Sequence, residues 1–247
     1  APGIYANRAL ILKHWKLFLM LGVLFVPLAN GIIYVAYNFT TALNGGVVSA
    51  SQPALTVILS WLLFRDLINW KQGVGILIAA AGVFAILTRG EPAALLHLQF
   101  NSGDLMMIAA TLFIAAHNVL LRLVPAAIRI LPLLVVIQLA GLLVATPLYI
   151  AETLFYRPVP VTPETIAAML WVGIAVTVLA VGLTNTAVRI IGANKASVGN
   201  YLRAGFTAIL AILLLGEQFQ TFHAVGLVLV IGGVFLMTRS RQAVRST

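Results

Sequence analysis

The chain contains no cysteine and very few charged residues, and both shortages exclude kinds of protein. Without cysteine there is no disulfide, no thiolate metal site and no cysteine nucleophile. Only 9% of the 247 residues are charged and only six are acidic, whereas 62% are hydrophobic. A soluble domain of this size needs more polar side chains to cover its surface. The composition therefore predicts an integral membrane protein.

Common catalytic motifs are also missing. The sequence has no His-Glu-x-x-His, no Gly-x-Ser-x-Gly, no phosphate-binding glycine loop ending in Lys-Ser or Lys-Thr, and no paired intramembrane aspartates. We therefore expect no enzyme activity, no cofactor and no metal site. The lack of a nucleotide-binding motif favours a secondary transporter over a pump that hydrolyses ATP in the same chain.

Long apolar runs recur along the whole chain and predict its fold. About 20 apolar residues in a helix cross roughly 30 Å of hydrocarbon, and the alternation expected of a β-barrel is absent. We expect an all-α polytopic membrane helix bundle that forms one membrane domain. Thr162 as a cap and Pro163 at the first helical position mark one helix start. The eight predicted transmembrane helices are 15–37, 46–64, 70–87, 104–121, 130–150, 165–190, 196–215 and 223–237.

Basic residues concentrate on one side of the membrane when these helices are followed in turn. Twelve of the 15 lysines and arginines fall on the side that holds both chain ends, two fall on the other side, and Arg203 lies within a helix. By the positive-inside rule, the side with twelve is cytoplasmic. The net charge of +9 thus follows from topology, and no nucleic-acid partner is expected.

A shift of 151 residues maps one part of the chain onto another without a gap. Glycines, a threonine and an acidic residue match, which is less common by chance than apolar matches. The pairs are Gly22 and Gly173, Gly31 and Gly182, Thr56 and Thr207, Asp66 and Glu217, Gly75 and Gly226, and Gly82 and Gly233. The shift crosses five helices, an odd number, so the two copies have opposite orientations. Inverted repeats are typical of secondary transporters.

The repeat also predicts how the chain is organised. Residues 1–90 would hold the last three helices of a first repeat, and residues 91–247 would hold all five helices of a second. The partners of the fourth and fifth helices would precede Ala1. We therefore expect ten helices in the intact protein, with the first two absent from this chain.

The matched segments resemble the drug/metabolite transporter superfamily, in its ten-helix branch with two EamA-type domains. The resemblance is carried by 44–90, with Gln52-Pro53 and Leu62-Leu63-Phe64-Arg65-Asp66, and by 194–238, with Leu213-Leu214-Leu215-Gly216-Glu217. In the family, a helix ends in an apolar run, Gly and Glu, and a helix with spaced glycines follows. The second copy fits this pattern, whereas the first has Arg65-Asp66 instead. The resemblance implies a permease of the bacterial inner membrane, often an exporter of amino acids or other metabolites.

Polar side chains within the predicted helices are candidates for a substrate pathway, because polar groups are costly in lipid and face the bundle interior. Arg203 lies about eight residues into its helix. It either meets a substrate carboxylate, or reaches the membrane surface or the carbonyls of a neighbouring helix. The spacing i, i+3, i+7 puts Asn200, Arg203 and Thr207 on one helical face. Their repeat partners are Ser49, Gln52 and Thr56.

The first and sixth helices supply further candidates. Asn30, Tyr34 and Tyr37 share a face of the first helix, where they would line a cavity or belong to an aromatic belt at the interface. Asn185 is the repeat partner of Tyr34. It would line the pathway or form a hydrogen bond between helices.

The remaining candidates are ionisable or lie beside an ionisable group. His117 and Asn118 are deep in the fourth helix. His117 either relays protons or packs as a hydrogen-bonded core residue. Asp66 and Glu217 lie at helix ends on opposite sides, and capping or loop anchoring competes there with a role in ion coupling.

Together these features predict a secondary transporter that exports or exchanges small amino-acid-like or related amphipathic solutes by alternating access. Its expected partners are a small-molecule substrate and the lipid bilayer, and the oligomeric state is left open. The alternative is an intramembrane enzyme or a non-transporting membrane scaffold. Facing catalytic residues would favour the enzyme, and a core without a cavity would favour the scaffold.

Overall fold

The computed structural model describes residues 8–90, 101–125, 127–128, 130–155, 158, 160–180, 183 and 198–243. These residues form helices and connecting turns and contain no strand, which confirms the all-α prediction. The elements are α2 (Arg8–Lys13), α3 (Trp15–Val23), η1 (Leu24–Gly31), α4 (Ile32–Ala36), α5 (Ala42–Ala50), α6 (Gln52–Phe64), α7 (Trp70–Leu87), α8 (Ser102–Leu120), η3 (Leu121–Leu123), α9 (Ile130–Phe155), α10 (Pro163–Leu170), η4 (Trp171–Ala180), α13 (Val198–Leu215) and α14 (Thr221–Ala243).

Membrane-crossing helices account for most of the described chain. Four are long and apolar enough to cross a bilayer, and α5 and α6 together make a fifth, bent candidate. Three shorter apolar helices are Pro163–Ala175, Phe206–Leu215 and Thr221–Met237. These eight segments overlap the eight predicted from the sequence, so the protein is a polytopic membrane helix bundle.

The chain divides into two compact units. Unit 1 comprises residues 1–146 and 206–247, and unit 2 comprises residues 147–205. Unit 1 contains α2 to α8, most of α9, the second part of α13, and α14. Unit 2 contains the end of α9, α10, η4 and the first part of α13.

In unit 1 the first predicted span is one long helix whose middle third is wound as a π-helix. The residues that join α3, η1 and α4 keep right-handed helical dihedrals, so the helix is continuous. Pro27 lies inside the π segment. Proline has no N–H to donate and its ring crowds the preceding turn, so a wider winding lets the helix pass this residue. In unit 2, η4 is also a π-helix, and its residues 175–180 match 24–29 under the 151-residue shift.

The second predicted span is interrupted at Ser51, which the sequence analysis did not anticipate. Here α5 ends and α6 begins at a bend of 40°. Pro53 at the start of α6 has no N–H, which suits it to a first helical turn and not to a helix interior. Ser49 therefore belongs to α5, whereas Gln52 and Thr56 belong to α6, and the expected single polar face is bent between them.

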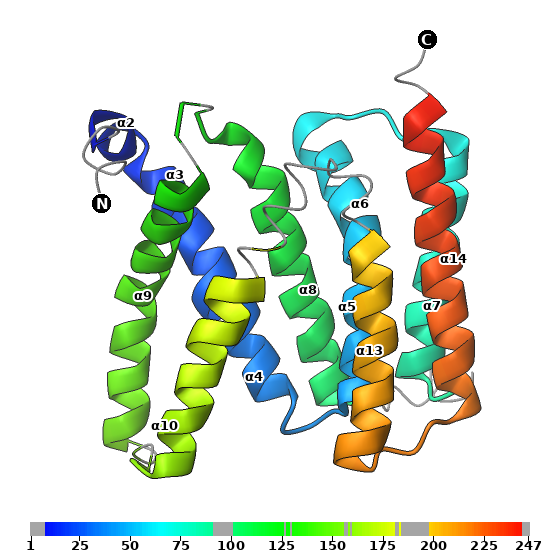
Figure 1. The fold of residues 1–247 in the computed structure, drawn as a ribbon. Helices are drawn as coiled ribbons and strands as arrows, with labels where there is room; N and C mark the ends of the chain where they lie inside the picture. The colour runs from blue at the N-terminus through cyan, green and yellow to red at the C-terminus, as the bar shows by residue number, and fades with distance from the viewer. Residues whose placement is uncertain are drawn as a thin grey trace. The chain divides into compact units, whose positions relative to one another are not determined.

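The most extensive helix pair in unit 1 is formed by α7 and α14, which lie side by side (Figure 1). Their contact is made through glycines. A Cβ added to Gly75 would lie 2.5 Å from the carbonyl oxygen of Gly233, and one added to Gly82 would lie 2.7 Å from that of Gly226. Glycine at these four positions lets the two backbones touch, as small residues do in membrane helix pairs.

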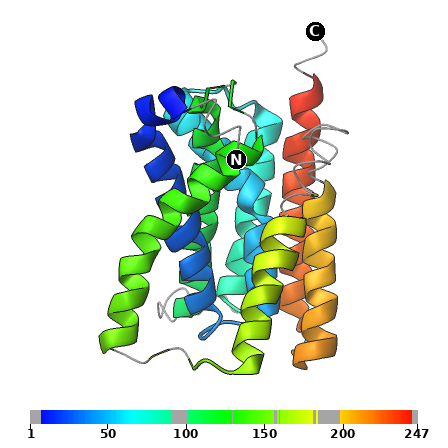
Figure 2. The ribbon, with the colours of Figure 1, turned by 60° about the vertical axis from the view of Figure 1, so that its left-hand side comes forward.

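A second contact brings α9 across α3 (Figure 2). A Cβ on Gly22 would lie 2.5 Å from the backbone nitrogen of Gly141, so these helices also meet backbone to backbone. Phe18, Leu21 and Ile137 form a buried apolar cluster beside this crossing.

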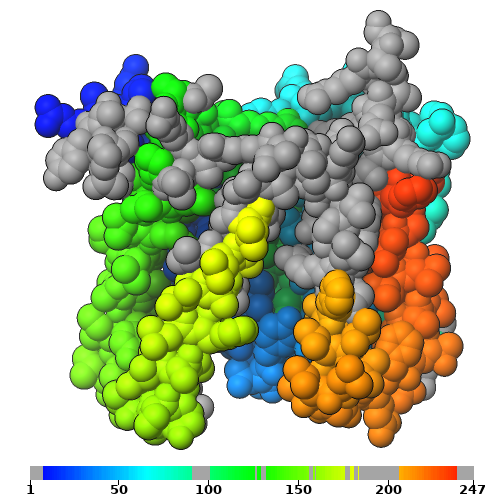
Figure 3. Space-filling model, in the orientation of Figure 1, coloured from blue at the N-terminus to red at the C-terminus, as the bar shows by residue number. Residues whose placement is uncertain are grey.

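Most of the described helices present apolar side chains at the surface. Along the described part of α13, Phe206, Leu213 and Leu214 are exposed, and Figure 3 shows this helix at the surface. Apolar surface of this extent is stable against lipid tails rather than water. In unit 2, Thr162 Oγ1 accepts a hydrogen bond from the Thr165 N–H (3.2 Å) and Pro163 opens α10, which confirms the predicted helix start.

Candidate functional site

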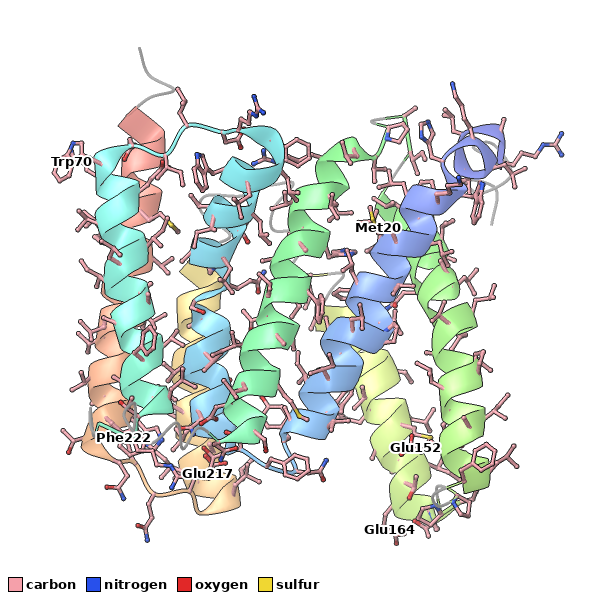
Figure 4. All side chains as sticks on the ribbon, turned by 180° about the vertical axis from the view of Figure 1, so that it is seen from behind. Met20, Trp70, Glu152, Glu164, Glu217 and Phe222 are labelled. Atoms are coloured by element: carbon pink, nitrogen blue, oxygen red, sulfur yellow. The ribbon has the colours of Figure 1, made fainter. Side chains whose placement is uncertain are left out.

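A cluster of polar side chains lies at one end of unit 1. Figure 4 labels Glu217 and Phe222 at this end, and Trp70 at the opposite end. The cluster joins five parts of the chain: the turn before α5, the first turn of α5, the first turn of α8, the α13–α14 connection and the start of α14. We refer to Thr40, Asn44, Asp104, Glu217 and His223 as the polar cluster.

Local sequence places the α8 side of this cluster. Asn101 caps α8 by accepting a hydrogen bond from the Gly103 N–H (2.7 Å), so Asp104 falls in the first turn. A Cβ on Gly103 would lie 2.7 Å from the backbone nitrogen of Thr40, so only glycine allows this close approach. The glycine thus brings the start of α8 against the turn before α5 and sets Asp104 beside Thr40.

Asp104 is the most deeply buried acid of the described chain, with 1% of its surface exposed. Its carboxylate accepts hydrogen bonds from the Thr40 hydroxyl and from the Asn44 amide nitrogen (3.2 and 3.3 Å). Its position in the first turn of α8 adds the favourable field of the helix N-terminus. The donors and the helix end together offset the desolvation of a buried carboxylate.

His223 completes a chain of hydrogen bonds that starts at Asp104. Its Nε2 lies 3.0 Å from Asn44 Oδ1, and its Nδ1 accepts a hydrogen bond from the Gln220 N–H (2.9 Å). The ring also packs against Phe222, with centroids 4.2 Å apart. Both ring nitrogens of His223 are therefore occupied, and the residue is buried.

Glu217 reaches the cluster from the connection between α13 and α14. Gly216, with a φ of 66°, ends α13 in the left-handed conformation, and glycine adopts it without strain. The carboxylate of Glu217 then accepts hydrogen bonds from the Ala42 N–H (2.7 Å) and the Leu43 N–H (2.9 Å). These amides are the free donors of the first turn of α5, so Glu217 caps a helix 174 and 175 residues away in the chain.

The candidates on the first span are placed differently. The Asn30 amide donates a hydrogen bond to the Phe25 carbonyl within its own π-helix (2.6 Å). Tyr34 is exposed, with 58% of its surface accessible. The Tyr37 ring packs over Gly45, whose added Cβ would lie 2.9 Å from Tyr37 Cε1. The structure does not bring these three side chains together in one site.

The candidates on the two repeat-related helical faces are partly buried or pack against a neighbouring helix. Ser49, Gln52 and Thr56 are half-buried, and the Thr56 hydroxyl donates to the Gln52 carbonyl (2.9 Å). Thr207 packs on α5, since a Cβ on Gly46 would lie 3.1 Å from Thr207 Cγ2.

His117 joins two helices. Its Nδ1 lies 3.0 Å from the Leu21 carbonyl oxygen, and because a carbonyl oxygen only accepts, His117 is the donor. Its ring packs against Phe25, with centroids 4.8 Å apart. Of the two alternatives for His117, this geometry favours a core residue that packs and forms a hydrogen bond. The neighbouring Asn118 is exposed.

The side chains of three further candidates lie outside the part of the chain that the structure describes. Asn185 lies outside the described residues, and so do the side chains of Asn200 and Arg203, although the backbone of both is helical in α13. Among the described residues, no group of three or more histidine, cysteine or acidic side chains is placed to hold a metal ion.

The roles of Thr40, Asn44, Asp104 and His223 were not predicted from the sequence, and of the polar cluster only Glu217 was expected to cap or to anchor a loop. A usable signal was present. Asn44, Asp104, Glu217 and His223 all lie at the ends of predicted helices that the topology assigns to the same side of the membrane. Polar residues at the same end of several helices are candidates for contact, even when they are far apart in sequence.

The described residues form a polytopic helix bundle with exposed apolar side chains, which defines an integral membrane protein. The EamA-like transporter family matches residues 3–88 and 101–239, which is most of the chain. The chain therefore belongs to the EamA-like transporter family and is a multi-pass membrane protein.

Several curated proteins are similar to this chain. The "Uncharacterized transporter YetK" of Bacillus subtilis (strain 168) is 30% identical over 202 residues, covering 81% of this chain and 60% of YetK. The "Uncharacterized transporter YyaM" of the same organism is 27% identical over 236 residues, covering 92% of this chain and 74% of YyaM. An "Uncharacterized transporter" of Archaeoglobus fulgidus is 27% identical over 235 residues, covering 93% of this chain and 78% of that protein. The chain thus spans 60% of the length of YetK.

Proposed function

We propose that the protein is a secondary transporter that moves small metabolites across a membrane by alternating access. Family membership supports transport, and the observation that carries the mechanism is the contact between α7 and α14. The two helices belong to the two sequence copies related by the 151-residue shift.

The α7–α14 contact is reciprocal under this shift. Gly75 corresponds to Gly226 and Gly82 to Gly233, whereas the contacts join Gly75 to Gly233 and Gly82 to Gly226. Exchanging the copies therefore converts one contact into the other, as a twofold axis does at an isologous interface. Two inverted copies related in this way have two equivalent asymmetric arrangements, and switching between them exposes a central site to each side in turn.

This symmetry also supports the proposed division of the chain. Residues 1–90 would carry helices of the first inverted repeat and residues 91–247 the second. We place the protein in a bacterial inner membrane with both ends of this chain cytoplasmic, on the distribution of basic residues.

The proposed substrates are amino-acid-like or related amphipathic solutes, exported or exchanged. A pathway lined largely by uncharged polar groups suits a solute with both apolar and polar parts. Arg203, within α13, would pair with a carboxylate of that solute.

A proteoliposome screen tests the proposal. Uptake and counterflow of labelled amino acids, organic anions and cationic drugs are measured with the protein and with Arg203→Ala. We expect transport of at least one carboxylated solute, reduced about tenfold or more in the variant because a charge-assisted pair is lost. Arg122→Ala, which removes an exposed arginine, is the matched control and should transport normally. Unchanged transport by Arg203→Ala would remove Arg203 from the pathway, and no transport of any solute class would refute the function.

A further inference from the structure

The proposed function makes no use of the polar cluster, although Asn44, Asp104 and His223 are buried and the cluster is hydrogen-bonded across unit 1. It connects the two sequence copies, because Thr40 and Asn44 come from the first copy and Glu217 and His223 from the second. A transporter that opens at this end has to separate these groups. We therefore asked what controls their contact.

The hydrogen bonds of the cluster have only one consistent direction. Asp104 accepts, so the Asn44 amide nitrogen donates to it and Asn44 Oδ1 faces His223. Nε2 of His223 must then carry a proton and donate. Nδ1 accepts from the Gln220 N–H, so Nδ1 must carry none. The cluster is complete only with a neutral imidazole in its Nε2–H form.

The first repeat copy shows how histidine differs from its counterpart at this position. Gln220 and His223 correspond to Asn69 and Gln72 under the shift. In α7, Gln72 Oε1 accepts a hydrogen bond from the Asn69 N–H (3.0 Å), as His223 Nδ1 does from Gln220 in α14 (2.9 Å). Gln72 and His223 each occupy the third helical position, whose side chain accepts from the N-cap N–H in a capping box. Glutamine performs this capping without titrating, whereas histidine gains a proton within the physiological pH range.

Protonation of His223 would break the cap and weaken the Glu217 contact. A proton on Nδ1 would point at the Gln220 N–H, so that hydrogen bond would be lost and the start of α14 released. The imidazolium would then attract the nearest carboxylates, and the two that act on this ring are Glu217 and Asp104. Glu217 would exchange its bonds to the Ala42 and Leu43 amides for a bond to the imidazolium, which frees the first turn of α5.

Charged groups from each neighbouring element shape this response. Burial of the ring opposes the cation, Glu217 from the α13–α14 connection and Asp104 from α8 attract it, and α5 contributes the neutral Asn44. Arg89, at the end of α7, lines the groove that also contains Gln220 and Phe222. This groove has a volume of about 620 Å³ and reaches Gln220, the residue whose N–H donates to His223 Nδ1.

We propose that the polar cluster is a proton-controlled latch. Neutral His223 keeps this end of unit 1 closed, and a proton bound at His223 Nδ1 releases Glu217 from α5. The ligand of the site is the proton, and no bond other than hydrogen bonds forms or breaks. The coupling of this latch to transport rests on the function proposed above, whereas the release of Glu217 can be measured without it.

Hydrogen–deuterium exchange of the full chain in lipid nanodiscs tests the latch. Exchange of the peptide that covers residues 41–48 is measured between about pH 8 and pH 5 and divided by the intrinsic rate at each pH. We expect the Ala42 and Leu43 amides to exchange about tenfold faster at the acidic end, because each loses a hydrogen bond to a charged acceptor. A flat profile in the native protein would overturn the proposal.

The matched variant is His223→Gln, because the chain itself uses glutamine for the same cap at Gln72. This variant should keep slow exchange at all pH values. His14→Gln, at the opposite end of unit 1, should respond as the native protein does. If His223→Gln keeps the full pH response, the titrating group is not His223, and the proposal is wrong.

A histidine NMR titration gives a readout that does not depend on one variant folding. The chain has four histidines, so the His223 signal can be assigned by replacing either His223 or the other three. It should show the Nε2–H tautomer at high pH and titrate in parallel with the exchange of Ala42 and Leu43. An Nδ1–H tautomer, or a titration unrelated to the exchange, would contradict the latch.

Failure of the latch and failure of the proposed function give different results. If proteoliposomes transport a solute but exchange at Ala42 and Leu43 is independent of pH, the latch is wrong and the transport function stands. If exchange responds to pH and His223→Gln removes the response, the latch is correct even when no tested solute is transported. With both intact, an acidic solution on this side should accelerate transport in the native protein and not in His223→Gln.

Discussion

The α6–α7 corner and the α13–α14 corner have the same backbone but send their acids to different partners. Arg65 and Gly216 both adopt the left-handed conformation, with φ of 56° and 66°. The next N–H, of Asp66 or Glu217, lies 3.5 or 3.2 Å from the carbonyl oxygen six residues earlier. Each corner thus ends its helix in the same way.

The two acids then diverge. Asp66 forms an ion pair with Arg122 (2.6 Å) in which both side chains are 42% exposed, whereas Glu217 caps α5. Asp66 is shorter by one methylene, and its nearest basic partner lies at the surface. The repeat therefore determines the backbone of a corner, while side-chain length and surroundings determine what the corner binds.

The largest expected effect tests the glycine contact that both copies share. Gly233→Ala places a Cβ 2.5 Å from the Ala79 nitrogen, where backbone cannot yield, so α7 and α14 must separate. We expect a loss of about 3 kcal/mol in stability, the upper end for an overpacked core because backbone atoms block the Cβ, measured as a lower midpoint of thermal unfolding in detergent. Gly82→Ala, at the related position, should have a similar effect.

The neighbouring Gly232 is the matched control for this pair. A Cβ there meets nothing within 4 Å, so Gly232→Ala should unfold at the native midpoint or slightly above it. Equal midpoints for Gly232→Ala and Gly233→Ala would show that α7 and α14 do not touch through these glycines. A large difference between Gly82→Ala and Gly233→Ala would contradict the reciprocal packing.

The next effect separates the two corners directly. Glu217→Gln replaces a carboxylate that accepts two helix N–H bonds, and we expect it to cost about 1.5–3 kcal/mol. Asp66→Asn breaks an exposed ion pair and should cost less than about 1 kcal/mol. Thermal unfolding of both variants at low and high salt provides the measurement. Only the smaller effect should decrease with salt, because exposed charges are screened.

The sequence predicts some of these features better than others. The start of α7 at Trp70 and the cap by Thr162 could be predicted, because hydropathy and capping depend on neighbours in sequence. The glycine pairs were recognised as repeated positions, but their partners were not, since packing depends on the register between distant helices. The shift did pair Asp66 with Glu217.

The polar cluster could not be assembled from the sequence, because its contacts span 60 to 179 residues. Each member also has an ordinary local explanation, as a cap or a helix-end polar group. The break at Ser51 was missed because the run from Gly46 to Phe64 is apolar on average, and hydropathy does not register a bend of 40°. Only Pro53 signalled it.

The smallest effects test whether the corners are truly equivalent in backbone. Gly216→Ala forces a residue with a Cβ into the left-handed conformation, which costs about 1 kcal/mol. Arg65→Gly relieves the same strain in the other copy, so it should stabilise slightly, by less than about 1 kcal/mol, because the flexible unfolded chain offsets part of the gain. Opposite signs in thermal unfolding would support the equivalence. Destabilisation by Arg65→Gly as large as that by Gly216→Ala would instead mean that the Arg65 side chain holds its corner through contacts that outweigh its strained backbone.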